Sequence, residues 1–299
     1  MAAQETNTRP REPISLKNEA RLLPAYALCG VWVLFTAMVV GWVVCASLLT
    51  TSEIFSDTMM RSFFSRLASF SLNVGNYAKA WSTQRVNVFF MNSLAYSLIA
   101  CTAIVAVAAP AAYVLSRFRF PGNALIQNLI SAALGIPAIM IIMPLFSVVS
   151  SLRLNDAPRV TIVVLYVAMN VPFTVFFLLA FFKNLPGTFE EAAAIDGCPP
   201  IATFWRVMFP LAQPGVVTVT IFNFITVWNE YFMSLIFAND SKARPVAVGL
   251  YNMIQSMRYT GDWGGMFASV VIVFAPTFLL YIFLSEKIIA GVTGGAIKG

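Results

Sequence analysis

The sequence contains no histidine, and only 11% of its 299 residues are charged. Histidine is the commonest general base near neutral pH and the commonest metal ligand, so its absence argues against an intramembrane metalloenzyme and we expect no bound metal. A soluble domain usually carries about a quarter charged residues. Because 59% of the residues are hydrophobic, the composition predicts an all-α membrane protein that crosses the bilayer several times.

Reactive cysteines and nucleotide-binding motifs are also missing. None of the four cysteines shows C-x-x-C spacing, so we interpret them as small buried or surface residues and not as a disulfide framework. The glycine-rich carboxyl end contains Lys298, but Ile297 stands where a phosphate-binding loop requires glycine. Neither a Gly-x-Ser-x-Gly nor a His-Glu-x-x-His motif occurs. We therefore expect no catalytic residue and no cofactor in this chain, and any energy for transport must come from a partner or from an ion.

The net charge of +6 does not indicate nucleic-acid binding. The basic residues are scattered over the hydrophilic gaps, without a cluster that also contains interleaved aromatics. Contact with phospholipid and the control of membrane topology explain such a distribution better. We expect lipid and no nucleic acid among the partners.

Long apolar runs are abundant, and a run of about 20 residues suffices to span a bilayer. Six occur, approximately at Tyr26–Leu49, Phe89–Leu115, Leu125–Val149, Val160–Phe182, Val216–Phe237 and Phe267–Ile289. Residues 1–24 are polar, and Pro10 and Pro13 argue against a long helix there, so we expect an amino-terminal tail followed by one transmembrane domain over residues 25–299. Pro137 and Pro144 in the third run, and Pro172 beside Asn170 in the fourth, predict kinks, which occur both along transport paths and in ordinary membrane helices.

Six spans place both ends of the chain on the same side of the membrane. Cytoplasmic loops usually carry an excess of lysine and arginine. If the amino end lies inside, ten basic residues fall on the inner side and nine on the outer side. The count therefore leaves the orientation open, although the polar tail and the turn Arg117-Phe118-Arg119 favour an inner amino end.

Glu230 is an acidic residue placed within a predicted span, in the segment Trp228-Asn229-Glu230-Tyr231. A carboxylate facing lipid costs several kcal/mol, so an intramembrane acid is by default a candidate functional residue. It can line a translocation path or gate together with Asn229, Tyr231 and Asn170, or couple transport to protons. A purely structural role as a hydrogen-bond partner, satisfied by Asn229 or Tyr231, remains a further alternative.

Residues Leu185–Gly215 form a polar interruption between the fourth and fifth runs. Thr188 and Glu191 have the spacing of a capping box, and Gly197 suits the left-handed position that closes a helix, so a helix of roughly 8 residues is expected. A second helix is expected to begin at Pro199 and to end at Pro210. Two short helices meeting at a sharp angle are typical of a docking element as much as of a plain loop.

The spacing within this interruption resembles the EAA loop of ABC importer permeases. That loop has the pattern E-A-A, three residues, G, nine residues, then I-x-L-P. Here Glu191-Ala192-Ala193 is followed after three residues by Gly197 and after nine more by Val207-Met208-Phe209-Pro210. The two departures, Val207 and Phe209, exchange one apolar residue for another.

Further segments resemble the second, six-span permease subunit of the maltose-type carbohydrate importers. They are Asn76-Tyr77, Asn92-Ser93-Leu94, Arg117-Phe118-Arg119-Phe120, Pro144-Leu145-Phe146, Leu154-Asn155, Pro172-Phe173, Trp228-Asn229-Glu230-Tyr231 and Gly291–Gly299. The resemblance covers nearly the whole chain after the tail. It implies a permease fold with six transmembrane helices, both termini in the cytoplasm, and a place in a bacterial or archaeal cytoplasmic membrane.

The resemblance also implies site residues. The EAA helix of the family inserts into a cleft of a cytoplasmic ATPase subunit. By analogy the coupling residues are Glu190, Glu191, Ala192, Ala193, Asp196 and Gly197. The carboxyl end, including Gly295 and Lys298, is expected to reach the ATPase dimer interface.

The implied assembly contains a second, related permease subunit in a heterodimer with this chain, two ATPase subunits that hold ATP and magnesium, and an extracytoplasmic solute-binding protein. The implied function is the import of a carbohydrate by alternating access, driven by ATP hydrolysis in the partner subunits. The alternatives are an ion-coupled secondary carrier that uses Glu230, a permease for another solute such as a sugar phosphate, and a membrane enzyme or receptor without transport.

Overall fold

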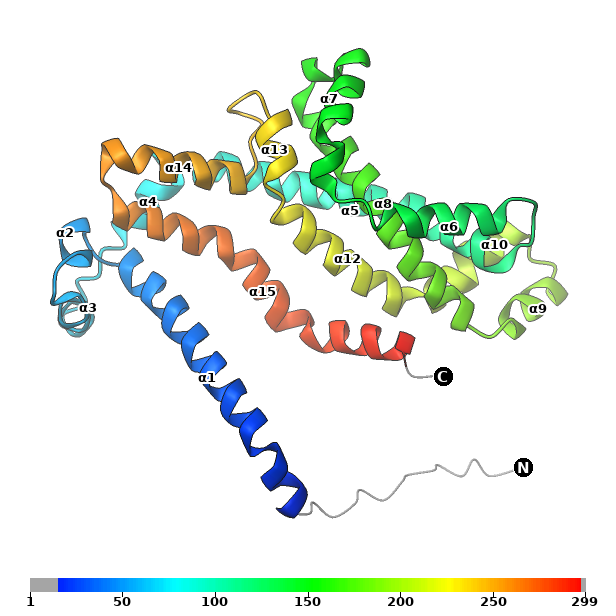
Figure 1. Ribbon diagram of the computed structural model, residues 1–299, viewed down its shortest axis with the longest axis horizontal. Helices are drawn as coiled ribbons and strands as arrows, with labels where there is room; N and C mark the ends of the chain where they lie inside the picture. The colour runs from blue at the N-terminus through cyan, green and yellow to red at the C-terminus, as the bar shows by residue number, and fades with distance from the viewer. Residues whose placement is uncertain (1–15, 297–299) are drawn as a thin grey trace.

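The computed structural model describes residues 16–296, with side chains described for 22–286 except Arg258 and Thr260. Over these residues the chain is all-helical and contains no β-strand (Figure 1), as predicted. The helices are α1 (Leu16–Ser47), α2 (Thr51–Ile54), α3 (Met59–Ala68), α4 (Gly75–Ser82), α5 (Val86–Arg117), α6 (Asn123–Ala133), η1 (Ala138–Ile141), α7 (Ile142–Ser151), η2 (Leu154–Asp156), α8 (Pro158–Asn184), α9 (Thr188–Ile195), α10 (Pro200–Thr203), η3 (Phe204–Met208), α11 (Phe209–Leu211), α12 (Gln213–Trp228), α13 (Phe232–Phe237), α14 (Val246–Thr260) and α15 (Trp263–Ala296).

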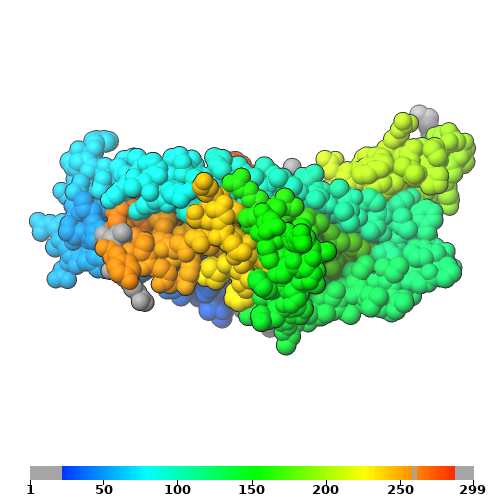
Figure 2. Space-filling model, turned by 90° about the horizontal axis from the view of Figure 1, so that it is seen from above, coloured from blue at the N-terminus to red at the C-terminus, as the bar shows by residue number. Residues whose placement is uncertain are grey.

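Four of the six predicted spans are continuous helices. α1, α5, α8 and α15 each contain an apolar stretch of 24 to 32 residues that is long enough to cross a membrane. At 1.5 Å per residue, α5 is about 48 Å long and connects two ends of the molecule. Helices α2, α3 and α4 lie at one of these ends, which we call the α4 end. Helices α9 and α10 lie at the other, which we call the α9 end (Figure 1 and Figure 2).

The third apolar run is a bent pair of helices. α6 and the segment formed by η1 and α7 meet at 99° across a short break. Pro137 lies in this break with an extended backbone (φ −62°, ψ 129°). Because proline lacks an amide hydrogen and disfavours a helical conformation in the residue before it, the helix ends ahead of Pro137.

The fifth run departs from the prediction of one helix over residues 216–237. α12 ends at Trp228 after 16 residues, about 24 Å, which is less than the roughly 30 Å of the hydrocarbon core. The chain then leaves the bundle through α13 and returns as α14. α14 packs against α5 and α15, the two helices that α12 also contacts, so it continues the course of α12 toward the α4 end (Figure 1).

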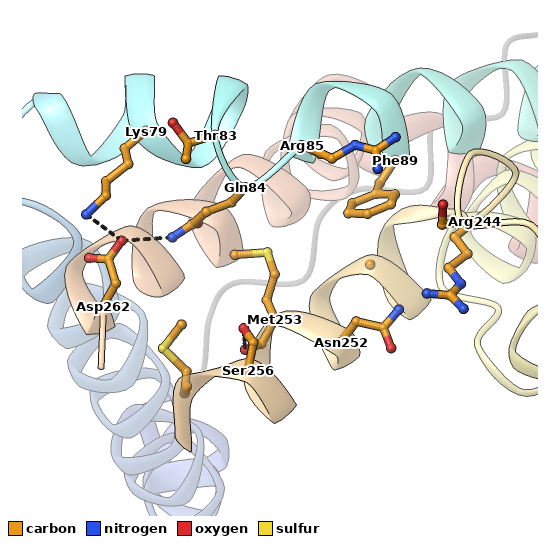
Figure 3. Close-up of a pocket in the computed structure, with 13 residues that line it drawn as sticks. Lys79, Thr83, Gln84, Arg85, Phe89, Arg244, Asn252, Met253, Ser256 and Asp262 are labelled. Carbon is orange, nitrogen blue, oxygen red and sulfur yellow. Dashed lines mark hydrogen bonds and ion pairs between the residues drawn. The ribbon is translucent and has the colours of Figure 1, made fainter. Parts of the chain in front are cut away.

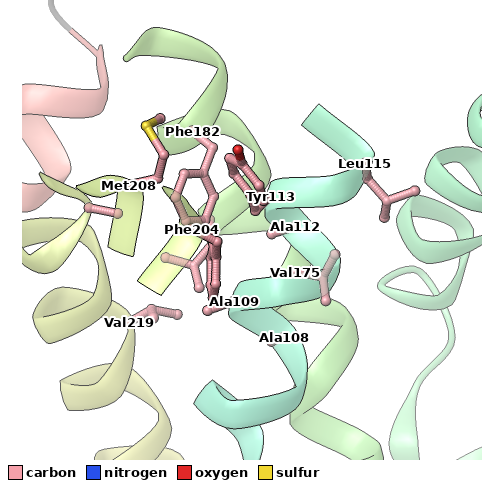
Figure 4. Packing of buried hydrophobic residues seen from close by; sticks show 12 residues of the cluster. Ala108, Ala109, Ala112, Tyr113, Leu115, Val175, Phe182, Phe204, Met208 and Val219 are labelled. Atoms are coloured by element: carbon pink, nitrogen blue, oxygen red, sulfur yellow. The ribbon is translucent and has the colours of Figure 1, made fainter. Parts of the chain in front are cut away.

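The best-packed part of the core joins α5 and α8 near the α9 end. Ala108, Ala109 and Ala112 of α5 are fully buried, and their small side chains allow α8 to approach closely. Larger residues fill the adjacent space, with Phe182 of α8 and Met208 of η3 also fully buried (Figure 4). This packing attaches the segment after α9 to α5 and α8.

Gly215 shows how tightly α12 is held at this end. A methyl group built on its Cα would lie 2.6 Å from the ring of Phe181 in α8. Real side chains do not approach so closely, so only glycine permits this contact between α12 and α8. The start of α12 is thereby fixed against the same helix that precedes α9.

α1 differs from the other spans because it leaves the bundle. Its carboxyl end packs near α15, whereas its amino half diverges from the remaining helices (Figure 1). The most apolar window of α1 contains no buried residue. The helix begins at Leu16 and passes through Pro24, so the absence of a long helix predicted for residues 1–24 does not extend to residues 16–24. The division into tail and transmembrane domain remains a prediction.

Candidate functional site

α9 is a helix of eight residues at the turn between α8 and the bent segment α10–α12. The predicted capping box is wrong, because Gly187 and not Thr188 occupies the N-cap position and no side chain caps the helix. The backbone carbonyl of Gly187 instead accepts hydrogen bonds from the amides of Glu190 and Glu191, at 3.0 and 3.1 Å. The adjacent acids still lie at the positive end of the helix dipole.

The carboxyl end of α9 is closed as predicted by Gly197. Its φ of +74° lies in the left-handed region, where glycine carries no steric penalty. The amide of Cys198 donates to the carbonyl of Ala193 at 2.9 Å, and that of Gly197 donates to Ala194 at 3.0 Å. This is the hydrogen-bond pattern of a Schellman motif, and it turns the chain sharply into α10.

The second helix does not end at Pro210, contrary to the prediction. Residues Phe204–Met208 form a π-helical turn, and helix resumes through Pro210 to Leu211 before bending by 74° into α12. The amide of Phe209 bonds the carbonyl of Phe204, five residues back. The widened turn accommodates a proline that has no amide hydrogen and would otherwise crowd the preceding turn.

An ion pair anchors α9 to the end of α5. Arg117 Nε lies 3.2 Å from Glu190 Oε1, and both side chains are mostly buried. The same guanidinium donates through Nη2 to the carbonyl of Leu185 at 2.7 Å. Ala193 adds a packed contact, since only 7% of its surface is exposed. Glu190 and Ala193 therefore face the protein itself.

The opposite face of α9 is open. Glu191, Ala192, Asp196 and Gly197 are all exposed. Among the described residues Asp196 forms no ion pair, either with Arg206 or with any other basic side chain. The six predicted coupling residues thus divide into an inner pair and an outer group of four.

Exposed apolar side chains border this outer group, and sequence reasoning missed them. Ile195 is 87% exposed and Ile201 is 77% exposed, and half of Trp205 is also accessible. We call the surface formed by Glu191, Ala192, Asp196, Ile195 and Ile201 the α9 face. The signal in the sequence was an isoleucine on each side of the Asp-Gly-Cys-Pro-Pro turn, where a plain loop would have polar residues.

Aromatic rings link the α9 face to the transmembrane helices. The ring of Phe204 lies 5.1 Å from Tyr113 of α5 and 6.3 Å from Phe182 of α8, measured between centroids (Figure 4). Its neighbour Trp205 packs edge-on against it at 4.8 Å. The segment that follows α9 is therefore packed directly against α5 and α8.

The sequence placed Glu230 within a span, but in the structure it lies in the break between α12 and α13. Its carboxylate accepts hydrogen bonds from the amides of Met233 (2.6 Å) and Ser234 (3.0 Å) and from the Ser234 hydroxyl (2.9 Å). The hydroxyl of Tyr166 in α8 donates a fourth at 3.2 Å. Glu230 thus caps α13 and ties it to α8, and its partners are not the Asn229 and Tyr231 suggested by the sequence.

The other predicted path residues lie around the same break. Asn229 donates to the carbonyl of Ile225 in its own helix, and Tyr231 packs against Tyr251 of α14 at 5.4 Å. Asn170 donates to the carbonyl of Tyr166, the residue that also contacts Glu230. Asn170 thus contacts the backbone of Tyr166, and Glu230 contacts its hydroxyl. Whether these residues line a path remains a prediction.

Comparison with known proteins places these features in a family. Residues 103–288 match the family described as "Binding-protein-dependent transport system inner membrane component". The match covers more than half of the chain. The chain belongs to this family. The family and the candidate spans identify a multi-pass permease of the cytoplasmic membrane, which confirms the resemblance drawn from the EAA spacing.

Curated relatives match this permease over nearly its full length. The diacetylchitobiose uptake system permease protein NgcG of Streptomyces coelicolor is 32% identical over 274 residues, which cover 92% of this permease and 88% of NgcG. The trehalose transport system permease protein SugB of Mycobacterium tuberculosis is 30% identical over a match that covers 90% of this permease and 97% of SugB. The trehalose/maltose transport system permease protein MalG of Thermococcus litoralis is 29% identical over a match that covers 79% of this permease and 84% of MalG.

A solved structure shares the fold. It is the crystal structure of a bacterial ABC transporter involved in the import of the acidic polysaccharide alginate. One of its chains superposes on this permease with a TM-score of 0.77, covering 92% of this permease and 99% of that chain, at 20% sequence identity. At this identity the similarity establishes the permease fold and nothing finer.

The α4 end of the permease contains an open cavity of about 510 Å³ between α4, the start of α5 and α14 (Figure 3). The carboxylate of Asp262 forms an ion pair with Lys79 and accepts a hydrogen bond from Gln84, both at 2.9 Å. Arg85 lies in the wall with a left-handed backbone (φ +60°), and Arg244 also lines the cavity. The cavity is rich in donors and lies at the end opposite the α9 face.

The predicted contacts of the carboxyl end are only partly within the described residues. Gly295 lies in the last turn of α15, which runs to Ala296. Lys298 lies outside the described residues. Both assignments therefore remain predictions.

Proposed function

We propose that this permease is one subunit of an ATP-driven, binding-protein-dependent importer of carbohydrates, and that its α9 face binds a cytoplasmic ATPase subunit. Sugar transport is named for all three curated relatives described above. The permease itself would hold neither ATP nor magnesium, which belong to the ATPase subunits. The observation that carries the proposal is an exposed acidic and apolar surface on a helix that is rigidly anchored to two spans.

The chemistry of the α9 face suits a protein partner. Ile195 and Ile201 project almost completely from the surface and gain most when another protein covers them. Glu191 and Asp196 lie beside them, exposed and without an internal ion pair, so both can pair with cations of the partner. The small side chain of Ala192 allows a close approach.

The proposal includes an orientation and a mechanism. With the α9 face in the cytoplasm, both termini lie there too, and the α4 end faces the solute-binding protein. Closure of two ATPase subunits would move the α9 faces of this permease and of a related second permease, and the spans would open outward. Such a cycle requires two states that ATP and the loaded binding protein favour by different contacts.

The structure gives the ion-coupled alternative less support. Glu230 accepts four hydrogen bonds that fix α13, so its carboxylate is occupied by a structural task. Uptake into vesicles tests the alternatives directly. We expect uptake only when ATP, the ATPase subunits and the binding protein are present, whereas uptake driven by a proton or sodium gradient without ATPase subunits would overturn the proposal.

Cysteine crosslinking tests the α9 face, and adjacent alanines provide a matched pair. In a chain whose four native cysteines are replaced by alanine, Ala192→Cys presents an exposed thiol and Ala193→Cys a buried one. We expect a short bifunctional reagent to join position 192, and not position 193, to an ATPase subunit. Equal crosslinking at both positions, or at neither, contradicts the proposed face.

A further inference from the structure

A second cleft opens at the α9 end, between the carboxyl end of α5, the start of α6 and the end of α8. Its volume is about 620 Å³. Three of its lining side chains are basic, namely Arg117, Arg119 and Lys183, and none is acidic. A concentration of positive charge without a carboxylate attracts an anion.

The three cations are not equally available. Arg117 is partly neutralised, because its Nε faces Glu190 at 3.2 Å and its Nη2 donates to the Leu185 carbonyl. Lys183 Nζ contacts only a neutral acceptor, the Oε1 atom of Gln127 at 3.0 Å. Arg119 is exposed and has no ion pair within the described part of the chain. Two full charges therefore lack a counter-ion.

The walls of the cleft are held in place by amide side chains. Asn123 donates to the carbonyls of Phe118 (2.6 Å) and Leu115 (3.2 Å) at the end of α5. Gln127 donates to Leu115 at 3.1 Å and also hydrogen-bonds Asn123. These bonds satisfy the last carbonyls of α5 and connect them to α6. The basic side chains consequently project from a defined frame.

Exposed apolar side chains lie within the cleft and elsewhere on α6, the helix that forms one of its walls. Phe118 and Phe120 are more than one third exposed, and Leu125 and Leu129 of α6 are about 60% exposed. Aromatic residues at the end of a span typically lie at the level of the lipid headgroups. An occupant that fits both surfaces has an anionic head and an apolar tail.

We propose that this cleft binds the phosphate of an anionic phospholipid between Arg119 and Lys183, with its acyl chains along the exposed face of α6. Arg and Lys donate to phosphate oxygens through charge-assisted hydrogen bonds. Basic pockets beside transmembrane helices on the cytoplasmic side suit anionic headgroups. The assignment to the cytoplasmic leaflet rests on the proposed orientation, whereas the binding itself does not.

Native mass spectrometry of the full-length permease tests this. The protein is extracted from vesicles of equal parts phosphatidylcholine and phosphatidylglycerol, and the retained lipid is identified. We expect bound phosphatidylglycerol, with retention falling about fivefold for each charge removed in Arg119→Gln and Lys183→Gln. The charge-preserving variant Arg119→Lys with Lys183→Arg should retain the lipid, which separates loss of charge from loss of fold.

A control variant removes the same charge at the other end. Arg61→Gln with Lys242→Gln changes exposed residues outside the cleft and should leave retention unchanged. Equal retention by the cleft variant and the wild type overturns the proposal. Binding of inorganic phosphate without retention of phosphatidylglycerol would show that a free anion, and not a lipid, is the occupant, and would also overturn the proposal. Retention is measured without ATPase subunits, so this result is independent of the proposed transport function.

Discussion

Two interruptions of the apolar chain place glutamates at the start of a short helix, yet the structure uses them differently. At α9, Glu190 turns inward to Arg117 while the adjacent Glu191 remains exposed. At the break after α12, the single carboxylate of Glu230 accepts four hydrogen bonds. A carboxylate beside a helix N-terminus is stabilised in either case, so its surroundings and not its residue type determine whether it is free for a partner.

The comparison separates two tasks. The outer part of α9 keeps unpaired acids beside apolar side chains and is open to contact with another molecule. The break at Glu230 is internally satisfied and is built to hold a change of direction. The following predictions test this distinction, beginning with the largest expected effect.

Replacement of Glu230 by alanine should have the greatest effect on stability. It leaves the amides of Met233 and Ser234 without their acceptor, and of the two hydroxyls, which also hydrogen-bond each other, one loses its acceptor. Each unsatisfied buried group costs about 1–3 kcal/mol. We expect a loss of about 3 kcal/mol or more in the free energy of unfolding, measured by denaturant in detergent, because several such groups are affected. Glu230→Gln keeps one acceptor oxygen, so its free energy of unfolding should lie between those of the wild type and the alanine variant. A wild-type unfolding curve for the alanine variant would show that the break does not depend on this carboxylate.

The adjacent acids of α9 should respond in opposite ways. Glu191→Ala alters an exposed side chain and should change stability by less than about 0.5 kcal/mol, while it weakens ATPase binding by about tenfold, since a lost charge-assisted hydrogen bond is worth about 1.5–3 kcal/mol. Glu190→Ala should mainly reduce stability. Paired measurements of unfolding and of ATPase affinity test the split. Identical profiles for the two variants would remove the basis for an inner and an outer side.

A double-mutant cycle measures the anchor of α9 itself. Arg117→Gln, Glu190→Gln and the double variant should give a coupling free energy of about 1 kcal/mol, because the pair is mostly buried and joins two helices. The pair Arg61 and Asp57, which form no ion pair, serves as the control with zero coupling. Strict additivity for Arg117 and Glu190 would mean that packing of Ala193 alone holds α9.

The smallest effect concerns an acid at a third helix start. Burial alone would raise the pKa of the Glu53 carboxyl, but hydrogen bonds from Thr50 and the ion pair with Arg66 outweigh it and lower the pKa. A lowered pKa stabilises the folded state at neutral pH, and that contribution is lost as the pH falls through the folded-state pKa. Glu53→Gln should therefore cost less than about 1 kcal/mol at pH 7 and nothing once Glu53 is protonated. Unfolding followed from pH 7 down to pH 3 checks this; a constant difference would refute it.

Much of the fold could be predicted because apolar run length is a strong signal. α1, α5, α8 and α15 are continuous hydrophobic helices, each with one internal proline of the kind that membrane helices tolerate. The fifth run was wrongly predicted to be one helix, because Asn229, Glu230 and Tyr231 are a short polar or amphipathic segment within an otherwise apolar stretch. One of the four hydrogen bonds of Glu230 comes from Tyr166, 64 residues away, and no local pattern shows such a partner.

The candidate site was predictable in position but not in orientation. The EAA spacing located α9 and its closing glycine. It did not show that Ala193 is buried while Ala192 is exposed, because this depends on how α9 lies against α5. The capping box had the correct chemistry at the wrong place: it is found at Thr50 and Glu53, where the Glu53 carboxylate accepts from the Thr50 amide at 2.9 Å.

The shortness of α12 has a consequence for biosynthesis. With 16 residues, it is too short to cross a bilayer securely by itself. It packs between α5, which is already made when α12 leaves the ribosome, and α15, which emerges only later in translation. The membrane insertion of this half of the chain is therefore completed only when α15 arrives, and a protein truncated after α14 would expose the flank of α12 to lipid and to proteases.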